Sequence, residues 1–315
     1  MSNLSTAQMA TCWMHAGPAR PFTWQNWSPW SFRSRVAQVA RAGFVGMGVF
    51  HEDLAFVLAN EAEGSSEEEK LAWMKGLFDA HGITEIEVEF LTEWVHPNDD
   101  PRRRGEMENR RLVLAAAKAF GARHIKAGNF GIPLPDKAFL RSRFHELCDE
   151  AAEAGTRIAF EILPPDPNSQ TLEQTLEWMG DHPAAGLFLD TWHVNNMDGI
   201  SYADIAALPK RKLIGVELDD GLAFDDEDKA VLARPGMPGF LDLTVNCRRI
   251  PGEGDYDVVG FINACRAAGF DGPWGNEILS EEFRRLPMEI AYKRVFQATG
   301  KQLRLAGMAE KGAAA

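Results

Sequence analysis

A change from a predicted helix to a predicted strand occurs in Ala154-Gly155-Thr156-Arg157-Ile158-Ala159-Phe160-Glu161-Ile162, and the same change repeats along this chain. An amphipathic segment from about 136 to 154 precedes it, and the spacing of the apolar residues there predicts a helix. Gly155 is expected to end that helix, because glycine readily adopts the left-handed conformation that follows a last helical turn. The apolar run at 156–162 then predicts a short buried strand.

The same order, a helix that ends at a small residue and glycine followed by a short apolar run, recurs along the chain. It predicts seven strands, at residues 44–50, 83–90, 122–128, 156–162, 185–190, 212–219 and 273–279. A weaker eighth strand is predicted at the front, at Thr11-Cys12-Trp13-Met14-His15. Eight strands that alternate with helices through short connections favour parallel βαβ units closed into a barrel. The first strand is not followed by G-x-G-x-x-G, which disfavours an open dinucleotide-binding sheet.

The predicted fold is therefore α/β, a single (β/α)8 TIM barrel with an extended C-terminal helix. Because no Pro/Ser-rich linker divides the chain, residues 1–305 are assigned to one barrel domain. The final helix is predicted from about Glu281 to Leu305, and residues 306–315 are expected to form a flexible tail. The longest connection between predicted elements, from Asp220 to Asp255, follows the seventh strand and has the length of a lid or binding loop.

Composition and charge narrow the class of protein. The 315 residues include 33 basic and 46 acidic side chains, which gives a formal net charge of −13, and 45% of the residues are hydrophobic. These values indicate a folded soluble protein, and the negative charge argues against nucleic acid as a partner. Four cysteines without a C-x-x-C pair are expected to stay reduced. Since there is neither a basic-then-apolar leader nor a run of 18 apolar residues, we expect a cytoplasmic protein with no membrane association.

Each of the last four predicted strands ends with an acidic residue. These residues are Glu161, Asp190, Glu217 (with Asp219 two positions later) and Glu277. In a (β/α)8 barrel the reacting groups come from these strand ends, and buried ionised carboxylates there need a positive partner. One divalent metal ion held by Glu161, Asp190, Glu217 and Glu277 meets that need, and oxygen ligands suit Mn²⁺ or Mg²⁺.

The alternative is a set of ordinary salt bridges inside the barrel. Lys126, on the fourth predicted strand, is the only strand lysine placed to point inward. It is expected either to pair structurally with Glu161 or to act as an acid in the site. Basic residues are otherwise scarce in these strands, so salt bridges explain one inward acid more readily than four.

Further side chains near the predicted strand ends are candidates for substrate contact. His193 follows Asp190 by three residues and is expected either to contact the substrate or to support the ligand before it. Trp13, Trp94 and Trp192 lie at or just past strand ends. Their aromatic faces could pack against a sugar or could belong to the core.

Arg248 lies near the end of the long connection, in Arg248-Arg249-Ile250-Pro251-Gly252-Glu253-Gly254-Asp255. An arginine that precedes a rigid Pro-Gly turn is suited to hold an anion or a hydroxyl group over the mouth of a barrel. The alternative is an ordinary surface turn.

These motifs resemble the xylose isomerase-like barrel superfamily, a group of sugar phosphate isomerases and epimerases. The resemblance covers most of the chain and rests on Phe160-Glu161, Leu189-Asp190-Thr191-Trp192-His193, the 248–255 segment and Asn276-Glu277. It implies one divalent metal ion, often Mn²⁺, held by Glu161, Asp190 and Glu277. Most members add a histidine from strand seven, where this chain has Glu217. A carboxylate in place of an imidazole favours Mn²⁺ or Mg²⁺ over Zn²⁺.

The resemblance also implies a reaction on a small sugar or polyol. Glu161 and Glu277 would form an acid/base pair on either side of the substrate, with His193 and Arg248 holding its hydroxyl groups. A metal ion on a carbonyl and a neighbouring hydroxyl acidifies the C–H between them and stabilises the enediolate. Return of the proton gives epimerisation or isomerisation. The alternative is a lyase that expels a β substituent, as dehydratases and enzymes cleaving 3-keto sugars or C-glycosides do, with His193 or Lys126 as a further acid.

Two other classes share this barrel. A DNA-repair endonuclease binds three zinc ions through many histidines, of which only His193 has a counterpart here. A metal-free binding or partner subunit also remains an alternative, because a fold does not establish an activity. We expect an unphosphorylated substrate, since no phosphate-cradling Gly-rich loop precedes a helix. A homo-oligomer or a small partner subunit is compatible with this fold.

Overall fold

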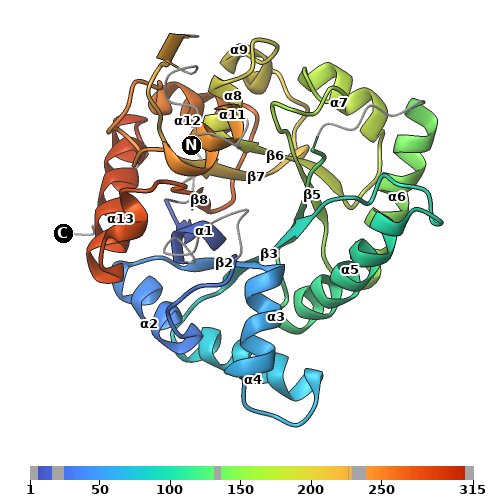
Figure 1. Cartoon of the computed structure of the whole chain (residues 1–315). Coiled ribbons are helices and arrows are strands. Elements are labelled where there is room, and N and C mark those ends of the chain that lie inside the picture. The colour runs from blue at the N-terminus through green and yellow to red at the C-terminus, as the bar shows by residue number, and fades with distance from the viewer. Residues whose placement is uncertain (1–5, 16–24, 131–135, 226, 229–238, 309–315) are drawn as a thin grey trace.

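In the computed structural model of this protein, eight parallel strands close into one barrel, as the sequence predicts (Figure 1). The structure describes residues 6–15, 25–130, 136–225, 227–228 and 239–308. The strand order follows the chain, and β1 completes the ring by pairing with both β2 and β8. The strands are β1 (Gln8–Ala10), β2 (Gly46–Phe50), β3 (Glu85–Leu91), β4 (His124–Ala127), β5 (Ile158–Glu161), β6 (Ala185–Asp190), β7 (Leu213–Leu218) and β8 (Trp274–Asn276).

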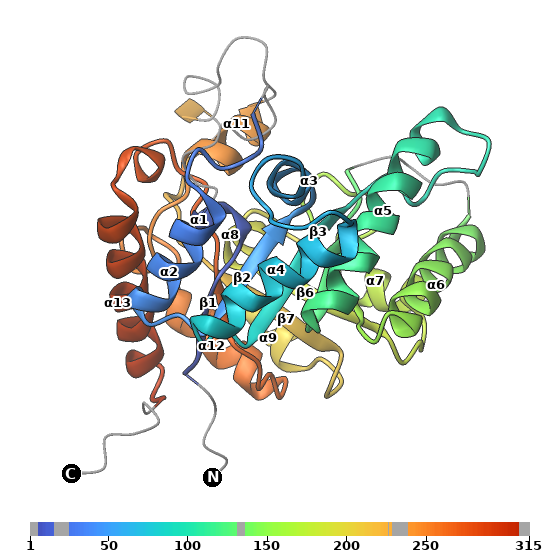
Figure 2. The same cartoon turned by 90° about the horizontal axis from the view of Figure 1, so that it is seen from below.

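Helices surround the barrel and connect its strands (Figures 1 and 2). Three of them start at or within one residue of a strand end, since α3 directly follows β2, α8 directly follows β6, and α1 begins after a single residue beyond β1. These helices therefore lie at the carboxyl end of the barrel. The helices are α1 (Cys12–His15), α2 (Phe32–Ala42), α3 (His51–Asn60), α4 (Glu67–Ala80), α5 (Pro101–Phe120), α6 (Lys137–Glu153), α7 (Leu172–Met179), α8 (Thr191–Asn195), α9 (Tyr202–Ala206), α11 (Gly239–Asn246), α12 (Val258–Ala267), the 3-10 helix η1 (Phe283–Arg285) and α13 (Met288–Leu305).

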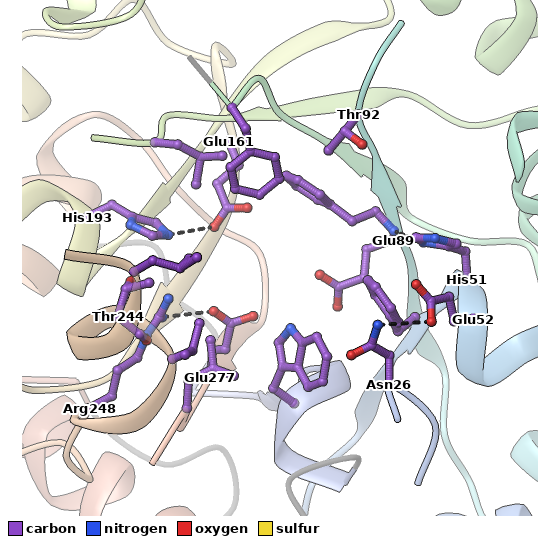
Figure 3. Close-up of a pocket in the computed structure, with 18 residues that line it drawn as sticks. Asn26, His51, Glu52, Glu89, Thr92, Glu161, His193, Thr244, Arg248 and Glu277 are labelled. Atoms are coloured by element: carbon purple, nitrogen blue, oxygen red, sulfur yellow. Dashed lines mark hydrogen bonds and ion pairs between the residues drawn. The ribbon is translucent and has the colours of Figure 1, made fainter. Parts of the chain in front are cut away.

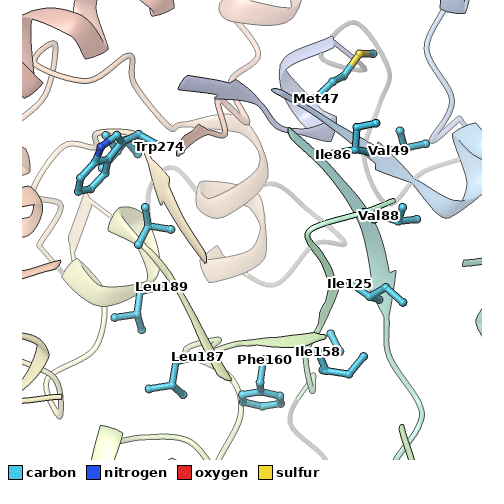
Figure 4. Close-up of a cluster of buried hydrophobic side chains, with 14 of the residues drawn as sticks. Met47, Val49, Ile86, Val88, Ile125, Ile158, Phe160, Leu187, Leu189 and Trp274 are labelled. Atoms are coloured by element: carbon cyan, nitrogen blue, oxygen red, sulfur yellow. The ribbon is translucent and has the colours of Figure 1, made fainter. Parts of the chain in front are cut away.

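Side chains along each strand alternate between the helices and the barrel interior, as the two-residue period of a strand requires. In β3, Ile86 and Val88 belong to the large core between the barrel and its helices, drawn in Figure 4. Glu87 and Glu89 take the intervening positions and are buried inside the barrel. Glu87 pairs there with His124 of the neighbouring strand, with 2.9 Å between Oε2 and Nε2. The outer face of the barrel is therefore apolar, whereas its interior carries charge.

A small apolar cluster closes the interior below the strand ends. It consists of Ala159, Phe188 and Ile214, separate from the main core. Ala159 and Phe188 lie two residues before Glu161 and Asp190, so each shares a strand face with the acid above it. The acids at the strand ends thus rest on an apolar layer and open toward the carboxyl end of the barrel.

The prediction of a strand at 11–15 is wrong by a few residues. The first strand is β1, and Cys12–His15 form the helix α1. The register explains the change, because Ala10 is the last residue of β1 paired with both β2 and β8. The Thr11 hydroxyl then donates to the Asn276 carbonyl oxygen at 2.6 Å, and the chain turns into α1.

The C-terminal helix begins later than predicted. Residues 283–285 form η1, and α13 starts only at Met288. Pro287 causes this break, because it holds the residue before it, Leu286, in an extended conformation (φ −78°, ψ 144°) that a continuous helix excludes. Beyond α13, Ala306 and Met308 are buried, and residues 309–315 of the predicted tail lie outside the described residues.

The long connection after β7 contains secondary structure that its sequence did not predict. Helix α11 lies within it, and residues 229–238 fall outside the described residues. The two ends of the connection meet in an antiparallel bridge between Asp220 and Arg249.

Among the described residues, no helix combines the length and the apolar composition that crossing a bilayer requires.

Close packing of β7 against β8 gives a test of the barrel geometry. A Cβ atom added at Gly275 would lie 2.6 Å from the Val216 carbonyl oxygen, whereas one added at the exposed Gly76 of α4 would meet no atom within 4 Å. We expect Gly275→Ala to lower the free energy of unfolding by about 1–3 kcal/mol through overpacking. Gly76→Ala should raise it by up to about 1 kcal/mol through helix propensity. Equal effects of both variants in urea unfolding would contradict this packing.

Candidate active site

A cavity of about 230 Å³ opens at the carboxyl end of the barrel (Figure 3). Its size suits a small molecule, and its walls combine aromatic side chains with a few polar groups, as ligand sites commonly do. The lining residues are Trp13, Asn26, Phe50, His51, Glu52, Glu89, Phe90, Thr92, Phe130, Glu161, Leu163, His193, Leu241, Thr244, Val245, Arg248, Glu277 and Leu279.

The four acids predicted at the strand ends converge beside this cavity. Glu161, Asp190, Glu217 and Glu277 each offer an oxygen atom, and these atoms all lie within 4.8 Å of one another. The strand register produces this convergence. Asp190 pairs directly with Glu217, and Glu217 pairs with Gly275, two residues before Glu277. All four side chains are buried. The structure therefore brings together the four residues that the sequence analysis selected as metal ligands.

Two further acids join them. Glu89 comes from β3, and Asp219 follows β7; both are buried. We call the six residues Glu89, Glu161, Asp190, Glu217, Asp219 and Glu277 the acid cluster. Six buried carboxylates in one volume require compensating positive charge.

Lys126 supplies one of the positive charges from within the barrel. Its Nζ lies 2.8 Å from Glu89 Oε2, 2.8 and 2.9 Å from the two oxygens of Glu217, and 3.6 Å from Glu277 Oε1. It is 1% exposed, rests over the Phe188 ring and does not line the cavity. Lys126 therefore pairs with Glu89 and Glu217 rather than with Glu161, because its side chain reaches across the interior from β4 to β7.

Arg248 supplies a second positive charge from the long connection. Its Nη1 lies 2.8 Å from carboxylate oxygens of Asp190, Asp219 and Glu277. The side chain is buried, so Arg248 is not part of a surface turn, although it also lines the cavity. Arg248 thus lies at the cavity, where its Nη1 contacts three acids, and its contact with substrate stays a prediction.

The Asp220 carboxylate stabilises the conformation of the connection that places Arg248 beside the acid cluster. Its oxygens accept hydrogen bonds from the backbone N–H groups of Gly252 (2.8 Å) and Tyr256 (3.0 Å). A Cβ at Gly254 would lie 2.4 Å from Asp220 Oδ1, so only glycine fits there. The Pro-Gly turn noted in the sequence is therefore a rigid element fixed by an aspartate directly after β7.

Burial raises the pKa of several carboxyl groups in the acid cluster despite the two cations. Burial raises the pKa of Glu277 to about 8, although Lys126 and Arg248 oppose the shift. Burial, with a neighbouring acid, also raises the pKa of Glu217 and of Asp219 well above their usual values. Burial opposes ionisation of Asp190 as well, but Arg248 and His193 lower its pKa. Two cations among six acids leave several carboxylates prone to hold protons.

The donor set of the acid cluster fits a divalent metal ion. Oxygen atoms of different side chains within 4.8 Å of one another match the spacing of ligands around one ion with metal–oxygen distances of about 2.0–2.6 Å. The four donors are not equally available, since both Glu217 oxygens contact Lys126. Asp190 contacts Arg248 through Oδ2 and accepts the His193 backbone N–H through Oδ1. Among the described residues, Glu161 has the fewest such contacts of the four, and its ion pair is with His193.

His193 lies where the sequence places it, at the mouth of the barrel. Its Nε2 is 3.4 Å from Glu161 Oε1, and its side chain lines the cavity. The backbone of His193 is held in place because Asp190 is the N-cap of α8 and its side chain accepts the His193 backbone N–H at 3.0 Å. One short helix therefore fixes both an acid and a histidine relative to Glu161.

The three tryptophans predicted near the substrate have different surroundings. Trp13 lines the cavity and packs against Phe50, with ring centroids 5.0 Å apart. Trp94 is fully buried and packs among aromatic rings such as Trp178, while its Nε1 donates to the Gly128 carbonyl oxygen at 3.0 Å. Trp192 is buried beside Tyr256 and Arg248. Neither Trp94 nor Trp192 lines the cavity, so both belong to the packing around the site.

Sequence reasoning missed one wall of the cavity. Figure 3 shows Glu89, His51, Glu52 and Asn26 across the cavity from Glu161, His193 and Glu277. A signal for Glu89 was present, because the alternation Glu85-Ile86-Glu87-Val88-Glu89 puts all three acids on one strand face. His51 directly follows a predicted strand, which is the position that barrel enzymes use for functional groups. Asn26 lies in a loop and had no such signal.

Comparison with known proteins places this fold and site in context. Residues 36–298 match the family model for the xylose isomerase-like TIM barrel. Over 158 residues the chain is 30% identical to the 3-dehydroshikimate dehydratase of Pseudomonas aeruginosa, a match that covers 49% of this chain and 23% of that enzyme. The matched segment is thus less than a quarter of that relative's length.

Solved structures give the same fold. The IolI protein, determined with a bound zinc atom, superposes with a TM-score of 0.74 at 18% identity, over 95% of this chain and 99% of that one. The 3-keto-D-glucoside 4-epimerase YcjR from E. coli superposes with a TM-score of 0.64 at 15% identity, over 94% of this chain and 99% of that one. At such identities the likeness concerns the fold.

The role of Lys126 as the internal cation can be tested through stability. Lys126→Met leaves Glu89 and Glu217 buried without their cation, so we expect the free energy of unfolding to fall by about 3–5 kcal/mol. Lys75→Met removes a lysine that pairs with Asp79 on the partly exposed face of α4, and it should cost less than about 1 kcal/mol. Urea unfolding followed by circular dichroism measures both. Equal losses for the two variants would show that Lys126 is not needed to balance the acid cluster.

Proposed function

The chain belongs to the xylose isomerase-like TIM barrel family, and we propose that it is an enzyme that removes a proton next to the carbonyl group of a small polyhydroxylated substrate with the help of a divalent metal ion. The observation that carries this proposal is the pair Glu161 and Glu277. Both carboxylates line the same cavity, and they reach it from β5 and from the end of β8. Two carboxylates facing one small-molecule cavity are the groups that proton abstraction and return require.

Glu161, Asp190 and Glu277 would hold the metal ion, with Glu217 as a fourth ligand. All four donors are carboxylates, which favours Mn²⁺, or Mg²⁺, over softer metals. When bound, such an ion polarises the substrate carbonyl and stabilises the negative charge that develops on its oxygen.

Side chains of this protein would carry out the proton transfers and the positioning of the reacting groups. Glu161 takes the proton from carbon, and His193, 3.4 Å from its Oε1, orients that carboxylate and contacts a substrate hydroxyl. Glu277 returns a proton from β8, which gives the epimer or the isomer of the sugar. Arg248 holds Glu277 and Asp190 in place, at 2.8 Å from each.

A dehydratase is the second candidate, because the curated relative named above is one, at 30% identity over half of this chain. In that reaction the C–H electron pair forms a C=C bond while the bond to a β hydroxyl breaks. Glu161 takes the C–H proton, and His193 gives the departing hydroxyl a proton so that it leaves as water. The two candidates share the first step and differ in the fate of the substrate.

Metal content tests the proposed ligands. We expect the purified protein to bind one Mn²⁺ per chain, and Glu161→Gln and Glu277→Gln to weaken this binding at least tenfold, since each loses a charged donor. Glu68→Gln, at the exposed start of α4, is the matched control and should bind as the wild type does. Dialysis followed by elemental analysis gives the stoichiometry. Absence of bound metal from the wild type, or unchanged binding in both site variants, would refute metal dependence.

Solvent exchange tests the reaction and separates the two candidates. Incubation with ketoses, 3-keto-glycosides and 3-dehydroshikimate in D₂O should exchange the C–H next to the carbonyl in at least one of them, as detected by NMR. Deuterium in an intact epimer supports the isomerase, and loss of a hydroxyl group supports the dehydratase. Glu161→Gln should reduce the rate at least a hundredfold, within the range for a general base. Lack of exchange in every compound would contradict proton abstraction in this substrate class.

A further inference from the structure

We propose that the cavity selects a neutral, hydroxyl-rich carbonyl compound and discriminates against phosphorylated and carboxylated analogues, with Glu52 as a residue that determines this specificity. This inference rests on the isomerase or epimerase reaction proposed above and counts against the dehydratase candidate, because 3-dehydroshikimate carries a carboxylate. It concerns the wall that faces the reacting end of the substrate. That wall carries Asn26, His51, Glu52 and Glu89 (Figure 3).

The charge of the lining residues is the first support. Among the described residues that line the cavity, four are carboxylates (Glu52, Glu89, Glu161 and Glu277) and one is a guanidinium, that of Arg248. Arg248 Nη1 already contacts three carboxylates of the acid cluster. Even with a bound divalent cation, the formal charge around the cavity stays negative. An anionic group on the ligand would therefore enter a volume of like charge, where each close contact is repulsive.

The wall across the cavity from Glu161 and Glu277 provides a second support, since its side chains can form hydrogen bonds with hydroxyl groups. Glu52 Oε2 accepts a hydrogen bond from the Asn26 side-chain amide at 2.9 Å, which fixes a carboxylate at the rim of the cavity. His51 Nδ1 accepts the Phe90 backbone N–H at 3.2 Å, so the proton of its neutral ring is on Nε2. Burial lowers the pKa of His51 and keeps that ring uncharged near neutral pH. Carboxylate acceptors beside a neutral imidazole match a hydroxyl group, which both donates and accepts.

Aromatic side chains complete the surroundings. Trp13 and Phe50 form one packed pair, and Phe90 and Phe130 form another with ring centroids 5.9 Å apart. All four line the cavity. Aromatic faces pack against the C–H faces of a sugar or cyclitol ring, while the polar groups between them form hydrogen bonds with its hydroxyl groups. The lining therefore fits a neutral polyhydroxylated ring or chain better than a compact anion.

Binding measurements with three ketoses of similar size test this inference without requiring turnover. The probes are D-fructose, D-fructose 6-phosphate and 2-keto-D-gluconate, titrated into the Mg²⁺-loaded protein and followed by saturation-transfer NMR. We expect the wild type to bind D-fructose at least tenfold more tightly than either anion. Glu52→Lys should shift this ratio at least tenfold toward the anionic probes, because it replaces a negative charge by a positive one at the rim. Glu52→Gln should shift it in the same direction by less.

Glu68→Lys is the matched control. Glu68, like Glu52, is an exposed acid in the first turn of a helix, so both changes alter the net charge and the helix terminus equally. This variant should keep the wild-type ratio. Equal or tighter binding of an anion by the wild type, no binding of D-fructose, or the same ratio in Glu52→Lys as in Glu68→Lys would overturn the inference. Loss of solvent exchange with discrimination intact would instead count against the proposed reaction alone.

Discussion

The compensation of buried negative charge is the constraint on which this structure depends. Six carboxylates from five strands or their ends meet in the acid cluster, and only Lys126 and Arg248 contact them as fixed cations with buried side chains among the described residues. The two cations have mainly different partners: Lys126 lies 2.8 Å from Glu89 and from Glu217, whereas Arg248 lies 2.8 Å from Asp190, Asp219 and Glu277. Burial keeps the pKa values of Glu217, Asp219 and Glu277 raised despite these two cations.

The barrel makes such a site because it aligns strand ends. Parallel strands place their last inward residues at one level, and the apolar cluster of Ala159, Phe188 and Ile214 lies beneath them. Helices that begin directly at the strand ends, such as α8 after Asp190, then add further groups with fixed geometry. The long connection after β7 contributes Arg248 only because Asp220 ties its two ends together. The same backbone hydrogen bonds that pair the strands therefore also position the side chains of the site.

The sequence was informative where a local pattern determines structure. The helix–glycine–strand order predicted the strands β2 to β8, and the acids that end β5 to β8 predicted the convergence of Glu161, Asp190, Glu217 and Glu277. It was less informative where the partner is distant in sequence. Lys126 contacts Glu217, 91 residues away, and Arg248 contacts Asp190, 58 residues away, so no local pattern specifies either pair. In the wall formed by Asn26, His51 and Glu52, His51 had a local signal because it directly follows a predicted strand, whereas Asn26 lies in a loop without one.

A crystal of the protein soaked in Mn²⁺ and measured at the manganese absorption edge tests most directly whether the acid cluster is a metal site. We expect one anomalous peak per chain, within coordination distance of Glu161, Asp190, Glu217 and Glu277. A map without a peak at the acid cluster, with Arg248 and Lys126 alone neutralising the carboxylates, would contradict it.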